Sequence, residues 1–177
     1  MKRVKNLPMA SAPFVFDEEG RVAWDRMWEL FCVLAIEGGP PHRETVLKGR
    51  GELNRRNEVY EKAVEEILRG YGMLVPFPVR EVRMGWIGVK VLTPRMAEWF
   101  ARVIETENVE CRREGRMILI PVNDDFRLEK EVKNVVTVMA KAYHYWTEHR
   151  TLVEKVMIAG WGWDGRFRNG DLKKSCG

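Results

Sequence analysis

The densest group of chemically active side chains in the sequence is the turn Gly38–Glu44. Its glycines, including Gly39, let the backbone approach a ligand closely, and its two prolines stiffen the chain. His42 titrates near neutral pH, and Arg43 can hold a carboxylate or a phosphate with two hydrogen bonds. Glu44 can orient the imidazole or act as a base. The turn predicts a binding or accessory module for a small anionic ligand or a protein partner, although a helix end followed by a solvated basic loop explains the same residues.

An enzyme is the first alternative, with His42 and Glu44 as candidate catalytic residues. His144 and Glu148 would aid them from across a cleft, since these two lie four residues apart and share a face of the last predicted helix. They are also the candidate metal ligands, but the spacing from His144 to His149 does not fit the zinc-binding helix motifs. The sequence therefore predicts no metal site, and it assigns neither a cofactor nor a reaction.

A second alternative is nucleic-acid binding by basic side chains of the predicted loop 42–57 and of a later hairpin. These side chains are Arg43, Lys48, Arg50, Arg55, Arg56, Arg112, Arg113 and Arg116. If they converge, they form a surface that neutralises phosphates. Glutamates interleave with them, and no motif of a known nucleic-acid-binding fold accompanies them. Nucleic acid is therefore allowed as a partner but not favoured.

The glycine-rich tail at residues 160–177 carries two tryptophans, Trp161 and Trp163, on either side of a glycine. Tryptophans in this setting can wall a ligand cavity or clamp a partner, so both are candidate ligand-binding residues. Sealing of the hydrophobic core explains them equally well.

The three cysteines, Cys32, Cys111 and Cys176, are widely spaced and form no CxxC pair. An odd and scattered set argues against a disulfide framework and against a structural zinc site. A reducing compartment is the simplest interpretation. We expect Cys111, which lies on a predicted strand, to be buried.

The composition bounds the class of protein. The chain has 177 residues, of which 45% are hydrophobic and 32% charged, and its formal net charge is +4. These values fit one folded domain with a mild preference for anions. We expect a flexible basic arm at residues 1–13 and a single domain at residues 14–177. Neither a signal-peptide pattern nor a run of about eighteen apolar residues occurs, so we expect a cytoplasmic protein that does not contact a membrane.

Hydrophobic periodicity and turn signals predict the elements along the chain. Helices are expected at residues 24–37, 58–69, 94–108 and 126–159, and strands at residues 14–16, 82–92, 109–113 and 117–122. Asn57, Thr93 and the run Asn123–Asp125 are expected to cap the helices that follow them. Gly70 and Gly72 are expected to end the second helix.

The order strand, helix, strand, strand, helix from Val82 onward predicts an α+β fold. We expect a small antiparallel or mixed sheet of about three to five strands, for example a ferredoxin-like half, packed against several helices. The apolar strand Met117–Ile120 should be central. The C-terminal helix is long, and its apolar stripe exceeds what one small sheet can cover. A homodimer formed through that helix is therefore a further prediction.

Overall fold

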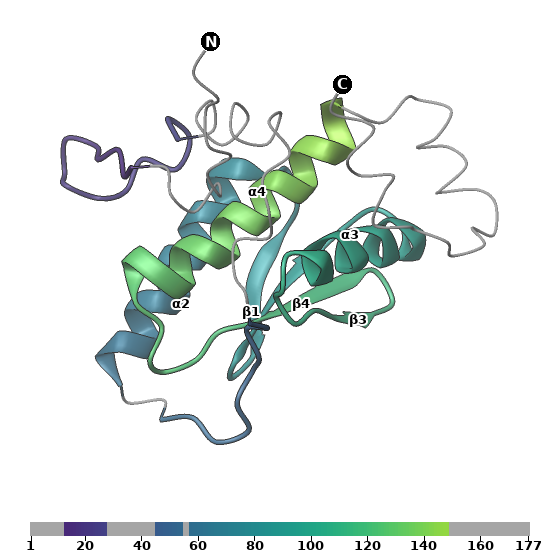
Figure 1. Cartoon of the computed structure of the whole chain (residues 1–177), viewed down its shortest axis with the longest axis horizontal. Coiled ribbons are helices and arrows are strands. Elements are labelled where there is room, and N and C mark those ends of the chain that lie inside the picture. The colour runs from purple at the N-terminus through teal and green to yellow at the C-terminus, as the bar shows by residue number, and fades with distance from the viewer. Residues whose placement is uncertain (1–12, 28–44, 55–56, 149–177) are drawn as a thin grey trace, which may run out of the picture.

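The computed structural model of this chain describes residues 13–27, 45–54 and 57–148. Within these residues three α-helices pack on a four-stranded antiparallel sheet (Figure 1). In chain order the elements are α2 (Glu58–Leu74), β1 (Val79–Arg83), β2 (Trp86–Lys90), α3 (Pro94–Thr106), β3 (Arg112–Glu114), β4 (Met117–Pro121), the π-helix η2 (Leu128–Val132) and α4 (Lys133–Glu148). The predicted α+β fold with a small antiparallel sheet and a long last helix is confirmed, because η2 runs directly into α4.

The strands lie in the order β1-β2-β4-β3, and each neighbouring pair is antiparallel. The central position predicted for Met117–Ile120 is confirmed, since β4 lies between β2 and β3. The single strand predicted over residues 82–92 is wrong. The chain turns at Gly85, whose φ of +84° is a conformation that glycine adopts without steric cost, and this turn makes a hairpin of β1 and β2.

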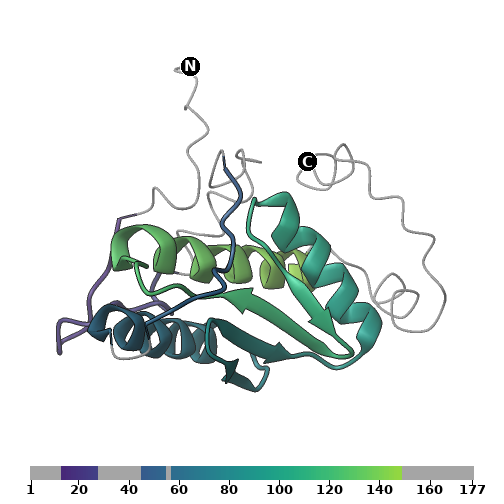
Figure 2. The same cartoon turned by 90° about the horizontal axis from the view of Figure 1, so that it is seen from below.

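The three helices cover one face of the sheet and enclose the core. Ile87 and Val89 of β2 and Ile118 and Ile120 of β4 belong to this core, which also contains residues of all three helices. Alternation along the strands places these four side chains on one face. Helix α2 contacts β1, α3 contacts β3 and β4, and α4 contacts both α2 and α3 (Figure 2). The helical layer therefore leaves β1 beside α2 at one edge of the sheet.

A strap at residues 45–54 runs along one end of the sheet, where it meets Trp86 at the start of β2, Pro121 at the end of β4 and the turn at Gly85. A Cβ atom added to Gly49 would lie 2.8 Å from the ring of Trp86, so the strap backbone passes directly over this tryptophan. Asn123 fixes the strap, because it accepts a hydrogen bond from the Arg50 N–H at 3.1 Å and donates one to the Lys48 carbonyl at 2.9 Å. The strap and its bonds bury Trp86 from the side that the helices do not cover.

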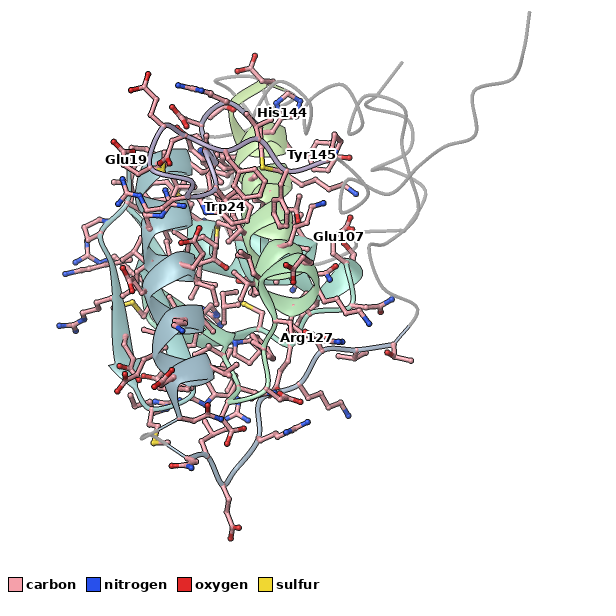
Figure 3. All side chains as sticks on the ribbon, turned by 90° about the vertical axis from the view of Figure 1, so that its left-hand side faces the viewer. Glu19, Trp24, Glu107, Arg127, His144 and Tyr145 are labelled. Carbon is pink, nitrogen blue, oxygen red and sulfur yellow. The ribbon has the colours of Figure 1, made fainter. Side chains whose placement is uncertain are left out.

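The second helix is longer than predicted, because it passes through Gly70 and Gly72 and ends at Leu74. A Cβ atom on Gly70 would lie 3.1 Å from Val136 and 3.2 Å from the ring of Trp24. Trp24 fills the space between α2 and α4 (Figure 3). Gly70 therefore allows close packing instead of ending the helix. The predicted cap at Asn57 is confirmed, since its side chain accepts a hydrogen bond from the Val59 N–H.

The cap predicted for the last helix is wrong. Helical residues begin at Leu128 in η2, after Arg127, whose side chain makes no capping hydrogen bond. The polar residues before it hold the strap and the start of α2 instead. Asp124 accepts hydrogen bonds from the Asn54 N–H through its carboxylate and from the Asn57 side chain through its carbonyl.

Two predicted elements near the start of the chain are only partly described. The strand predicted at residues 14–16 is reduced to an isolated bridge between Phe16 and Val22. Of the helix predicted at residues 24–37, only residues 24–27 are described, and these form a turn. The arm at residues 1–12 and the tail at residues 160–177 lie outside the described residues, as does any continuation of α4 beyond Glu148.

Residues 132–142 of η2 and α4 are all buried within one chain. The apolar stripe that motivated the predicted homodimer is therefore covered by the chain itself over this length. The homodimer stays a prediction, without support from this surface.

Candidate functional site

The site residues predicted in the turn Gly38–Glu44 lie outside the described residues. The same holds for the two tail tryptophans, Trp161 and Trp163. The predictions made for Gly39, His42, Arg43 and Glu44 and for these tryptophans therefore stay predictions.

The structure places His144 and Glu148 in the last turns of α4. His144 is buried, and its imidazole lies near the ring of Tyr145 (Figure 3). Glu148 is exposed. In the described ranges no group of three histidine, cysteine, aspartate or glutamate side chains is arranged to hold a metal ion. The pair therefore gains no third ligand within this part of the chain.

The basic side chains considered for nucleic-acid binding are described only at residues 48, 50, 112, 113 and 116. Arg50 forms an ion pair with Asp125 at 2.7 Å, and Arg112 pairs with Glu110 at 2.9 Å. The guanidinium of Arg112 also lies 4.1 Å from the ring centroid of Trp86. These two arginines thus fix the strap and cover a tryptophan, and an acidic partner offsets the charge of each.

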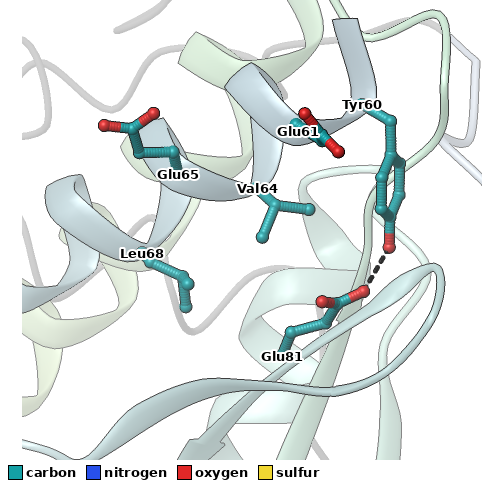
Figure 4. A pocket seen from close by; sticks show the side chains of 6 residues that line it. All are labelled: Tyr60, Glu61, Val64, Glu65, Leu68 and Glu81. Atoms are coloured by element: carbon teal, nitrogen blue, oxygen red, sulfur yellow. Dashed lines mark hydrogen bonds between the residues drawn. The ribbon is translucent and has the colours of Figure 1, made fainter. Parts of the chain in front are cut away.

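A groove of about 400 Å³ lies between α2 and β1 (Figure 4). The residues that line it are Tyr60, Glu61, Val64, Glu65, Leu68 and Glu81. Val64 and Leu68 are partly buried and pack against the core, so they form an apolar floor. Glu61 and Glu65 are exposed and form an acidic rim on α2, and Glu81 faces them from β1.

The spacing of residues along α2 produces this surface. Four lining residues of α2 follow each other at intervals of three, one and three residues, which places them on one face of a helix. They are Glu61, Val64, Glu65 and Leu68. The groove could not be predicted from the sequence, because half-buried aliphatic residues at this spacing are also typical of a core face. The available signal was the glutamate that stands three residues before each aliphatic residue.

Tyr60 closes one end of the groove. Its hydroxyl donates a hydrogen bond of 2.5 Å to Oε1 of Glu81 and accepts one of 2.8 Å from the Gly85 N–H. A hydrogen bond to a carboxylate is stronger than one between neutral groups. The first turn of α2 is thereby tied to β1 and to the turn that follows β1.

The strand beside the groove lies at an edge of the sheet. Among the described strands β1 pairs only with β2. The Lys90 N–H donates to the Pro78 carbonyl, so Pro78 faces β2, and in an antiparallel ladder the next residue faces the other way. The backbone N–H and C=O groups of Val79 and Glu81 therefore point away from β2, toward the edge of the described sheet.

Comparison with protein-family models, with curated proteins and with solved structures gives no match for this chain. Among the helices in the described ranges, none combines the length and the hydropathy that a membrane span requires. The fold and the groove are therefore interpreted from their own geometry.

Proposed function

We propose that this chain is a protein-binding module, and that the groove between α2 and β1 holds a segment of a partner protein. One observation carries the proposal: an apolar floor with an acidic rim lies between a helix and an edge strand. Grooves of this kind accept peptides, because the edge strand offers backbone hydrogen bonds and the floor offers apolar contact. The proposal keeps the protein partner predicted from the sequence and changes the location of the site.

The charge of the groove argues against an anionic ligand at this place. Glu61, Glu65 and Glu81 line it, and the described lining residues include no basic side chain. Like charges at close range disfavour binding, so a small carboxylate or phosphate is a poor occupant. The anionic ligand predicted for the turn Gly38–Glu44, the enzyme hypothesis and the cytoplasmic location stay predictions outside this site.

The proposal is tested with random peptides displayed on phage and selected on the immobilised full-length chain. Val64→Asp places a carboxylate on the groove floor, and Val59→Asp makes the same change on an exposed position of α2 that does not line the groove. Selected peptides should lose at least about tenfold in affinity for the V64D variant, as expected when an apolar contact at a binding centre is removed. Their affinity for V59D should stay within about twofold.

Thermal melting followed by circular dichroism establishes that both variants fold. If V64D does not fold, Val64→Thr replaces it, since threonine has nearly the same shape and a lower affinity for apolar surface. Selection of no peptide, or equal binding to wild type and the floor variant, would overturn the proposal.

A further inference from the structure

We infer that the occupant of the groove is an extended basic segment that adds to the edge of β1, with two arginine or lysine residues separated by one residue. This inference rests on the proposed function and specifies the partner of the same site. The lining residues, their spacing and the direction of the β1 backbone groups carry it.

The backbone of β1 can pair with an added strand over a short length. The groups of Val79 and Glu81 point away from β2, and each residue carries one donor and one acceptor. Pro78 precedes them and has no N–H, and a register shift between Glu81 and Arg83 interrupts the ladder after them. The added strand is therefore short, and the side chains in the groove must supply the specificity.

The distance between groove-lining side chains along α2 matches the distance between side chains on one face of a strand. Val64 and Leu68 lie four residues apart, which corresponds to about 6 Å along a helix. Glu61 and Glu65 repeat this interval. Side chains two residues apart on one face of a strand are separated by about 7 Å. Two consecutive groove-facing side chains of an added strand can therefore each meet one aliphatic residue and one glutamate.

Arginine and lysine suit these two positions best. Their methylene stems can cover apolar surface while the charged ends reach water or a carboxylate. In the groove the stems would lie on Val64 and Leu68, and the charged ends would reach Glu61 and Glu65. A purely aliphatic side chain would itself supply no counterion to the rim, and an acidic one would be repelled.

The probes are synthetic peptides about six residues long, which is the length of an ordinary strand. The first alternates arginine and threonine, and the second carries glutamate in place of each arginine. Binding to the full-length chain is measured by fluorescence anisotropy at low and at physiological salt. We expect the arginine peptide to bind, more weakly at the higher salt concentration because the rim is exposed, and we expect the glutamate peptide not to bind.

The rim is tested by the double variant E61Q/E65Q. Its matched control is Glu58→Gln, which removes an exposed carboxylate from the same helix outside the groove lining. Affinity for the arginine peptide should fall at least about fivefold with the double variant and less than about twofold with the control. Equal losses would overturn the role of the rim.

Strand pairing is tested with two N-methylated arginine peptides, one methylated at the arginine amides and the other at the threonine amides. Backbone groups alternate in direction along a strand, so only one of the two sets can bond to β1. If the peptide pairs antiparallel to β1, its arginines lie opposite Val79 and Glu81. The side chains of these arginines then face the groove, and their backbone amides bond to β1. Methylation of the arginine amides should then abolish binding, and the threonine-methylated peptide should retain it. Parallel pairing gives the reverse, and equal behaviour of both peptides would overturn strand addition.

The two proposals fail in distinguishable ways. Phage-selected peptides that need Val64 but lack paired basic residues would refute the basic strand-forming partner and would still support the protein-binding groove. The same conclusion would follow if peptides that need Val64 tolerate both methylations. Failure of any peptide to depend on Val64 refutes both.

The chain itself contains the same spacing twice outside the described residues, at Arg3 and Lys5 and at Arg166 and Arg168. Charge reversal of either pair in the full-length chain should leave affinity for the arginine peptide unchanged. A gain in affinity would show that the chain's own segment competes for the groove, and this result would overturn the assignment to a partner.

Discussion

The hydroxyl of Tyr60 donates to Glu81 on β1 and accepts from the backbone N–H of Gly85, at 2.5 Å and 2.8 Å respectively. One side chain thus joins the first turn of α2 to the edge strand and to the tip of its hairpin. The separation of α2 and β1 at this end of the groove is set by these two bonds.

Tyr60→Phe removes both hydrogen bonds and keeps the aromatic ring. Because one of them is to a carboxylate and the Gly85 N–H loses its acceptor, we expect the free energy of unfolding to fall by about 1.5–3 kcal/mol. Urea denaturation measures this loss. The arginine peptide should also bind more weakly, since the groove loses its fixed end. An unchanged unfolding midpoint would show that the contact contributes nothing to the fold.

The ion pair between Lys141 of α4 and Glu107 at the end of α3 is buried, with only 4% and 6% of the two residues exposed. Lys141→Met leaves the Glu107 carboxylate without this lysine, and breaking a buried pair in this way costs about 3–5 kcal/mol. The double variant K141M/E107Q also removes the remaining charge. We expect it to recover part of the lost stability in urea denaturation. A double variant less stable than K141M alone would contradict this account.

Gly88→Ala tests how closely neighbouring side chains pack against Gly88 on the sheet face away from the helices. An added Cβ would collide with Cγ2 of Val82 and would lie 2.9 Å from Sδ of Met117. We expect a loss of about 1–3 kcal/mol in the free energy of unfolding, as is usual for overpacking. Gly51→Ala is the matched control, because a Cβ there meets no atom within 4 Å. Similar losses in both variants would contradict a steric cause.

Elements with strong local signals could be predicted from the sequence. Thr93 and Pro94 mark the start of α3, Asn57 caps α2, and the most apolar strand, Met117–Ile120, is central. Each of these follows from chemistry within a few residues of the position concerned. The α+β class followed from the order of such elements.

Two of the failed predictions involve contacts between residues far apart in the chain. Gly70 is in contact range of Val136, and Asn123 bonds to the strap, so neither residue performs the local role that its type suggests. The groove depends on the separation of α2 and β1, which no local pattern encodes. From the sequence alone, Val64 is indistinguishable from a core residue.

Cys111 was predicted to be buried, and this is confirmed, since 8% of it is exposed. Burial raises the pKa of its thiol far above the ordinary value, and the neighbouring Glu105 carboxylate adds to this effect. Because the thiolate is the reactive form, Cys111 should not react with a disulfide reagent at pH about 8 while the chain is folded. The measurement uses a C32S/C176S background, and urea should expose one reactive thiol. Rapid reaction of the folded chain would contradict the burial.

Tyr71 makes the stability of the fold vary with pH in the alkaline range. It is fully buried, its hydroxyl donates to the Val135 carbonyl at 3.0 Å, and burial raises its pKa well above the ordinary value of 10.0. The folded chain therefore keeps this proton at a pH where the unfolded chain loses it. The corresponding stability is fully present below pH about 10 and decreases as the pH rises above that value.

Tyr71→Phe separates this effect from the titration of the other groups. The variant should be less stable than wild type near neutral pH, by about 0.5–1.5 kcal/mol for the lost hydrogen bond. Above pH about 10 its stability should fall less steeply with pH, because one proton fewer distinguishes the folded from the unfolded chain. Urea denaturation at a series of pH values gives both slopes. Parallel slopes for the two proteins would show that Tyr71 titrates alike in the folded and unfolded chains, contrary to its burial between α2 and α4.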